Sequence, residues 1–132
     1  MRIGIIGVGY VGLVSGVCFS DFGHTVTCID KDRNKIERLK DGVVTIYEPG
    51  LEAMQKKNMS SKRLFFEHNL DDFIQDFDVI FIAVGTPSRR GDGHANLDDL
   101  YSVAMTLKKF ISPSQILVIK STVPVGTNRK VS

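Results

Sequence analysis

Short hydrophobic segments alternate along the chain with longer segments in which apolar residues recur every three or four positions. The short segments predict strands over 3–6, 25–29, 64–66, 78–84 and 116–119. The longer segments predict helices over 11–22, 32–39, 51–58, 70–75 and 97–110, with a further helix starting near Gly126. Strands that alternate with helices in this way indicate an α/β domain, in which a doubly wound, mostly parallel sheet carries helices on both faces.

The strands also predict where a ligand would bind. The apolar run 78–84 is typical of a central strand that is buried on both faces, and 116–119 predicts another buried strand. In doubly wound sheets, ligands bind at the edge formed by the carboxyl ends of the strands. The candidate segments are therefore those that follow strands, at 7–12, 30–35, 85–87 and 121–124.

The first of these segments has the spacing Gly-x-Gly-x-x-Gly between a strand and a helix. Gly7 permits a tight turn, Gly9 lets a pyrophosphate approach the backbone, and Gly12 lets the helix pack against the strand. The N-terminus of that helix offers N–H groups and positive potential to the phosphates. This pattern predicts a Rossmann-type domain that binds a dinucleotide.

Asp30 ends the second predicted strand. A carboxylate at this place accepts hydrogen bonds from the adenosine ribose and repels a 2′-phosphate, which predicts NAD rather than NADP as the cofactor. Lys31, Arg33 and Lys35 lie close by in the sequence and leave a phosphate-binding alternative open.

Charge and composition speak against nucleic-acid binding and membrane association. The 132 residues carry a net charge of only +2, and the basic residues are not clustered with aromatic ones. The uncharged run 3–19 resembles a signal peptide, but five glycines interrupt it and Asp21 ends it, so we interpret it as a buried strand and helix. The basic residues in 56–63 are expected to form a solvated surface.

The cysteines and histidines show no metal-binding pattern. Cys18 and Cys28 are expected to be small buried side chains, and the three histidines are scattered along the chain. We therefore predict no metal site and a reducing, cytoplasmic location.

Four segments then make the chain recognisable: Gly7-Val8-Gly9-Tyr10-Val11-Gly12-Leu13, Ile46-Tyr47-Glu48-Pro49-Gly50-Leu51, Val84-Gly85-Thr86-Pro87 and Ser121-Thr122-Val123-Pro124-Val125-Gly126-Thr127. In this order they resemble the cofactor domain of the UDP-glucose/GDP-mannose dehydrogenase family, over essentially the whole chain. The last segment and Tyr47 are more similar to the branch that oxidises UDP-glucose than to the GDP-mannose branch. The weakest match is Asn96, where the family usually has aspartate.

The resemblance implies roles for particular residues in holding NAD. Val11 and the neighbouring backbone, including Tyr10 and the three glycines of the turn, would contact the pyrophosphate. Asp30 and Lys35 would hold the adenosine ribose, and Thr86 would lie near the cofactor. Without the resemblance, Thr86 could instead shape a turn before a proline, and Lys35 could be a solvated helix residue.

Two further residues would lie near the reaction. The resemblance implies that Thr122 sits near the nicotinamide and helps to position the water used in hydrolysis, and that Glu48 faces the substrate cleft. Taken alone, Thr122 could equally cap a helix, and Glu48 could be an ordinary surface carboxylate.

The family's reaction oxidises C6 of UDP-glucose in two steps, with two molecules of NAD, to UDP-glucuronate. A cysteine traps the intermediate aldehyde, and the resulting thioester is hydrolysed. Neither Cys18 nor Cys28 matches that cysteine, so we expect the nucleophile, a central helix and a UDP-sugar-binding domain to lie beyond Ser132. Residues 1–132 would then form one NAD-binding domain of a larger enzyme. We expect this domain by itself to be an inactive monomer and the whole enzyme to be a homodimer.

Three functions remain open. The first is the cofactor domain of a UDP-glucose-oxidising enzyme of nucleotide-sugar metabolism and polysaccharide biosynthesis. The second is the same domain of a GDP-mannose or UDP-N-acetyl-sugar 6-dehydrogenase. The third is a regulatory NAD-binding module without activity, which would have no reason to carry the segments 47–50 and 121–124.

Overall fold

A parallel sheet of five strands forms the centre of the part of the chain that the structure describes, in the order β3-β2-β1-β4-β5. The computed structural model describes residues 1–43, 48–69, 74–84 and 98–119, so the predicted site residues Thr86 and Thr122 lie outside the described residues. The strands are β1 (Arg2–Ile6), β2 (Thr25–Ile29), β3 (Leu64–Glu67), β4 (Val79–Ile82) and β5 (Ile116–Ile119).

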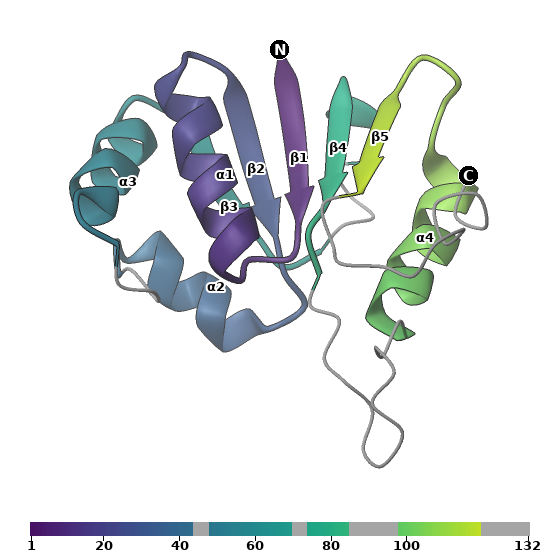
Figure 1. Ribbon diagram of the computed structural model, residues 1–132, viewed down its shortest axis with the longest axis horizontal. Helices are drawn as coiled ribbons and strands as arrows, with labels where there is room; N and C mark the ends of the chain where they lie inside the picture. The colour runs from purple at the N-terminus through teal and green to yellow at the C-terminus, as the bar shows by residue number, and fades with distance from the viewer. Residues whose placement is uncertain (44–47, 70–73, 85–97, 120–132) are drawn as a thin grey trace.

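Helices cover both faces of this sheet (Figure 1). They are α1 (Tyr10–Asp21), α2 (Arg33–Lys40), α3 (Leu51–Ser60), a 3₁₀ turn η1 (Ile74–Asp76) and α4 (Asp98–Phe110). The first three helices share one hydrophobic core with one face of β1, β2 and β3. Side chains of η1 and α4 pack with the other face of β1 and β4 in a second core. This arrangement confirms the predicted doubly wound α/β fold of Rossmann type.

Alternation along the strands divides the hydrophobic side chains between the two cores. On β1, Ile3 and Ile5 belong to the core beneath α1, whereas Ile6 belongs to the core beneath α4. Ile6 is in register with Ile29 of β2 and Ile82 of β4, and both lie in the same core. All these strands are parallel, so their carboxyl ends, and the segments that follow them, meet at one edge of the sheet.

The topology changes direction between β1 and β4. The chain runs outward from β1 through β2 to β3, and then returns to the other side of β1 to form β4 and β5. Crossovers that leave a strand in opposite directions separate at this point, and a crevice opens at the carboxyl edge. The fold thereby places the glycine turn after β1 next to the end of β4.

Most predicted elements are confirmed to within a few residues, but the prediction that 116–119 forms a buried strand is wrong. β5 lies at the edge of the described sheet, and Ile116 is 60% exposed. Ile116 is in register with Val79 and, through it, with Ile3, so the three side chains share one face of the sheet. Ile3, on β1, packs with residues of α1 and α3 on this face, whereas Ile116 at the edge is exposed. An uninterrupted apolar run does not distinguish a central strand from an edge strand that is half covered.

Three smaller differences concern local structure. The predicted strand 78–84 extends only over Val79–Ile82, and the described end of the predicted helix 70–75 is the short 3₁₀ turn η1. Cys28 is buried as predicted, but Cys18 is only half-buried. None of the helices in the described ranges combines the length and hydropathy needed to cross a lipid bilayer.

Candidate functional site

The glycine turn between β1 and α1 is held tightly against its neighbours. Gly7 has φ +99°, and its N–H donates to the carbonyl of Ile29 at 2.8 Å. A Cβ atom at Gly7 would lie 2.7 Å from the carbonyl oxygen of Ala83, and one at Gly12 would lie 1.8 Å from the carbonyl oxygen of Gly7. Side chains are thus excluded at both positions by backbone conformation or close packing.

Gly9 is different, because no contact with the described residues requires a glycine there. It is the N-cap residue of α1, with φ −81° and ψ −161°, and a Cβ atom would meet nothing within 4 Å. These dihedral angles are open to residues other than glycine. The missing side chain therefore leaves free space beside the helix N-terminus, of the kind a pyrophosphate needs to approach the backbone.

The N-terminus of α1 is suited to an anion. Gly9 offers no side-chain cap, and the first turn of α1 contains no acidic residue. The first N–H groups of a helix lack partners within the helix, and the aligned peptide dipoles give this end positive potential. Val11, in this first turn, is 45% exposed. Backbone donors and positive potential are therefore available to a phosphate at this end of α1.

Asp30, at the end of β2, is held in place by the surrounding backbone. Its Oδ2 accepts the N–H of Val8 at 2.9 Å, and its Oδ1 accepts the N–H of Asp32 at 2.9 Å. Lys35 Nζ lies 3.6 Å from Oδ2. A carboxylate has about four acceptor positions, so both oxygens can still accept hydrogen bonds from ribose hydroxyls. The Val8 hydrogen bond ties the carboxylate directly to the glycine turn.

An open cleft of about 530 Å³ joins these groups at the carboxyl edge of the sheet. Gly7, Gly9, Asp30 and Lys35 line it on one side. The remaining wall includes residues from the ends of β3 and β4 and from α4: His68, Ala83, Val84, Ser102, Val103 and Thr106. The volume lies within the range of small-molecule sites. The cleft has a helix N-terminus that fits the pyrophosphate of an adenosine diphosphate, and a fixed carboxylate that fits its ribose.

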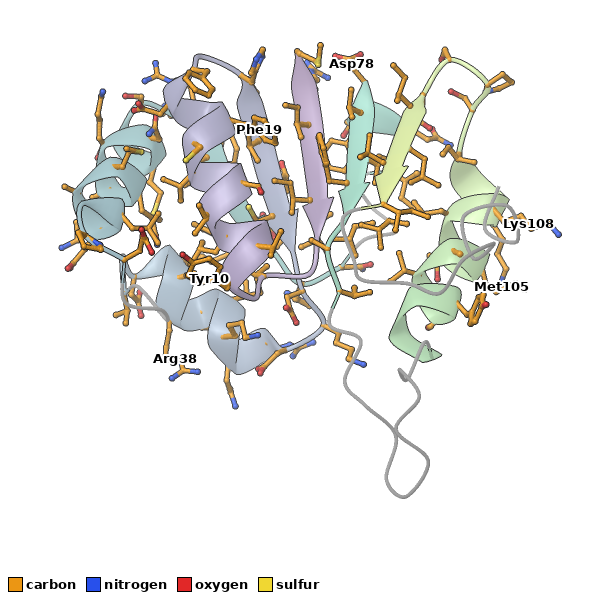
Figure 2. All side chains as sticks on the ribbon, viewed as in Figure 1. Tyr10, Phe19, Arg38, Asp78, Met105 and Lys108 are labelled. Atoms are coloured by element: carbon orange, nitrogen blue, oxygen red, sulfur yellow. The ribbon has the colours of Figure 1, made fainter. Side chains whose placement is uncertain are left out.

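Glu48 forms its hydrogen bond with Tyr10, and neither residue lines the cleft. The hydroxyl of Tyr10, the first residue of α1, donates to Glu48 Oε2 at 2.8 Å. This hydrogen bond, together with the negative charge of Glu48, raises the pKa of Tyr10 above its ordinary value. Figure 2 labels Tyr10 at the start of α1, near the carboxyl edge of the sheet. The pair joins the glycine turn to the segment that precedes α3.

The structure thus brings four of the predicted site residues into one cleft, namely Gly7, Gly9, Asp30 and Lys35. Tyr10, Val11 and Gly12 lie beside it in the first turn of α1. In the described ranges, no group of three or more His, Cys, Asp or Glu side chains could hold a metal ion.

Sequence reasoning missed several residues of the cleft. Val8 acts through its backbone N–H, so its side chain carries no signal. His68 directly follows β3, and the rule that sites gather after strands could have identified it. Ser102 and Thr106 lie one helical turn apart on α4, and only the packing of α4 against the sheet shows that they reach the cleft.

The chain matches a known protein family over its whole length. Residues 1–132 match the sequence model described as UDP-glucose/GDP-mannose dehydrogenase family, NAD binding domain. The chain is 53% identical over 131 residues to a UDP-glucose 6-dehydrogenase of Rhizobium meliloti, and this match covers 99% of the chain and 30% of that protein. It is 49% identical over 128 residues to one of Bacillus subtilis, which covers 97% of the chain and 29% of that protein. The chain therefore spans about 30% of the length of these relatives.

Solved structures agree with this assignment. The GDP-mannose dehydrogenase of Pseudomonas aeruginosa superposes with a TM-score of 0.93 at 36% identity, over 99% of this chain and 30% of that one. A UDP-glucose dehydrogenase of Pyrobaculum islandicum superposes with a TM-score of 0.89 at 38% identity, over 98% of this chain and 32% of that one. The matched domain is an NAD-binding one, in agreement with the cofactor predicted from the glycine turn and Asp30.

Proposed function

Because the chain belongs to the UDP-glucose/GDP-mannose dehydrogenase family, we propose that it is the NAD-binding domain of an enzyme that oxidises UDP-glucose at C6 to UDP-glucuronate. The observation that carries the cofactor role is the cleft in which the open N-terminus of α1 lies near the fixed carboxylate of Asp30. The choice of UDP-glucose rests on the identities of 53% and 49% to two UDP-glucose 6-dehydrogenases.

Each residue of the cleft would contribute to binding in a defined way. Backbone N–H groups at the start of α1 would hold the pyrophosphate, and Gly9 would leave room for it. Asp30 would accept hydrogen bonds from the ribose, with Lys35 beside it to balance the charge. Bound NAD supplies the hydride acceptor, and these residues hold and orient it. Thr86 near the cofactor and Thr122 at the hydrolytic water complete the proposal, on the family resemblance alone.

The rest of the reaction requires more chain than these 132 residues. The relatives are more than three times as long as the matched segment. We assign the nucleophilic cysteine, the central helix and the sugar-nucleotide domain to that remaining length, in a cytoplasmic homodimer. The chain of 132 residues would then be a monomer that binds NAD but does not oxidise UDP-glucose.

The cofactor role is tested by titrating this chain with NAD and NADP. We expect NAD to bind at least about tenfold more tightly, because Asp30 loses hydrogen bonds to the ribose and meets a phosphate when NADP binds. Asp30→Asn should remove most of this preference. Glu52→Gln is the matched control, since Glu52 pairs with Lys56 on α3 and does not line the cleft. Equal affinity for both dinucleotides would contradict the assignment of Asp30.

The substrate is tested separately, with a protein of the relatives' full length that carries this chain. We expect UDP-glucose to support NADH formation. GDP-mannose and UDP-N-acetyl sugars should support at most about a hundredth of that rate, because polar groups of the sugar site would lose their hydrogen-bond partners when the wrong sugar binds. Faster oxidation of GDP-mannose would show that the substrate is misassigned while the cofactor role stands.

A further inference from the structure

The hydrogen bond between Tyr10 and Glu48 joins two segments that are 38 residues apart in sequence. Tyr10 is 55% exposed, so the contact is not a consequence of burial in the core. Glu48 is half-buried, and its backbone carbonyl accepts the N–H of Leu51 at 3.1 Å in the turn that starts α3. The Glu48 backbone is therefore anchored to α3, while its side chain reaches across to the start of α1.

The Glu48 carboxylate contacts the first residue of α1 through the hydroxyl of that residue's side chain. Carboxylates at such places ordinarily accept N–H groups of the first turn and are stabilised by the helix dipole. In α1 neither the N-cap residue nor the first turn supplies an acid. Glu48 instead accepts from the phenolic oxygen, at the far end of the Tyr10 side chain. The N–H groups of the first turn are left to another anion.

We propose that Tyr10 is a positioning residue, which holds the Glu48 carboxylate by this hydrogen bond and keeps it away from the N–H groups that would bind the NAD pyrophosphate. The inference rests on the proposed function, because it takes the start of α1 as the pyrophosphate site. Once released from Tyr10, Glu48 competes with the pyrophosphate for the same donors and repels it. Two like charges at one helix terminus weaken the binding of both.

The state of the tyrosine agrees with this role. The hydrogen bond to Glu48 raises the pKa of Tyr10, so the hydroxyl keeps its proton and remains a donor throughout the neutral range. The hydrogen bond is exposed, which makes it replaceable without disturbing either hydrophobic core.

A double-mutant cycle tests the proposal by titration of this chain with NAD. Tyr10→Phe removes only the hydroxyl, and Glu48→Gln removes only the charge. We expect Tyr10→Phe to weaken NAD binding about threefold to fivefold. In the Glu48→Gln background, the same change should weaken binding by less than about 1.5-fold, because no carboxylate remains to compete. The effect of Tyr10→Phe should also shrink as the salt concentration rises.

Adenosine provides the ligand control, because it has the ribose but no phosphate. Its affinity should be equal in all four proteins, and their thermal midpoints should agree, which shows that neither folding nor the Asp30 end of the cleft has changed. Unchanged NAD affinity in Tyr10→Phe would overturn the inference and leave the proposed function intact. An equal loss in both backgrounds would also overturn it, since Tyr10 would then act directly. Failure of the original chain to bind either ligand would overturn both proposals.

Discussion

At the scale of single residues, the three positions of the turn are occupied by glycine for different physical reasons. Gly7 and Gly12 are required by the protein itself, since a Cβ atom at either would collide with backbone atoms. Gly9 has ordinary dihedral angles, and no atom of the described residues lies within 4 Å of the place its Cβ would take. The glycine spacing alone predicts that all three belong to one motif. Only the surroundings show which glycine serves the ligand and which two serve the fold.

Two alanine substitutions distinguish the glycine that serves ligand binding from one that serves folding. Gly9→Ala should leave the free energy of unfolding within about 1 kcal/mol of the original, because nothing opposes the added methyl group. It should weaken NAD binding at least about tenfold, because the methyl group occupies the space of the pyrophosphate. Gly12→Ala should lower the free energy of unfolding by about 3 kcal/mol or more, since its Cβ would lie 1.8 Å from a carbonyl oxygen. Urea unfolding and calorimetric titration measure both quantities, and normal NAD binding by Gly9→Ala would refute the placement of the pyrophosphate.

At the scale of elements, α1 packs so closely on β2 that a titratable group is enclosed between them. A Cβ atom at Gly16 would lie 2.5 Å from Cys28 Sγ, and Cys28 is fully buried. Burial raises the pKa of the Cys28 thiol from 9.0 to about 12. Below pH 9 the thiol is protonated in both the folded and the unfolded chain. Above that pH the unfolded chain loses the proton first, so ionisation of this thiol favours unfolding.

This linkage predicts an alkaline destabilisation that depends on one residue. Between pH 8.5 and 10.5, the stability advantage of the original chain over Cys28→Ala should shrink by about 2 kcal/mol, at about 1.4 kcal/mol per pH unit above 9. Val26→Ala, on the same strand and in the same core, removes a buried side chain that does not titrate, so its deficit should stay constant. Urea unfolding across this pH range measures both. A constant deficit for Cys28→Ala would refute the linkage.

A second contact between elements concerns the basic residues in 56–63, for which we expect a solvated surface. Lys56, Lys57 and Lys62 are exposed as expected. Arg63 is the exception, because it is half-buried and donates to the carbonyl of Ser20 at 3.2 Å and to Asn58 Oδ1 at 3.1 Å. Asn58 in turn donates to Asp21, and this hydrogen bond and that of Lys57 lower the pKa of the Asp21 carboxyl. The polar cluster connects α1, α3 and the start of β3, which a count of charges along the chain does not show.

At the scale of the whole molecule, the cleft is assembled from segments far apart in the sequence. The glycine turn, the end of β2 and one face of α4 each contribute a wall. Since a ligand bound there contacts elements on both sides of the sheet (Figure 1), it stabilises the entire folded chain. The parallel strands and the change of direction between β1 and β4 supply the crevice.

This predicts a concentration-dependent stabilisation by the cofactor. NAD at about a hundred times its dissociation constant should raise the free energy of unfolding by about 2.7 kcal/mol, which corresponds to a rise of several degrees in thermal midpoint. At the same NAD concentration, Gly9→Ala should gain at most about half of this free energy, about 1.4 kcal/mol, because its dissociation constant should be at least about tenfold higher. Differential scanning calorimetry measures the midpoints. A thermal midpoint that does not move with NAD would contradict the cleft as the cofactor site.

The sequence by itself determined the alternation of strands and helices, the parallel sheet, the glycine turn with its acidic partner and the family. These follow from local periodicity and short spacings, which neighbouring residues along the chain specify. Only the tertiary structure decided that β5 lies at the edge of the described sheet, that Arg63 belongs to a polar cluster, and that Ser102 and Thr106 line the cleft. It also decided that Tyr10 holds Glu48. Such contacts depend on how distant elements pack together, and no pattern within one segment contains that information.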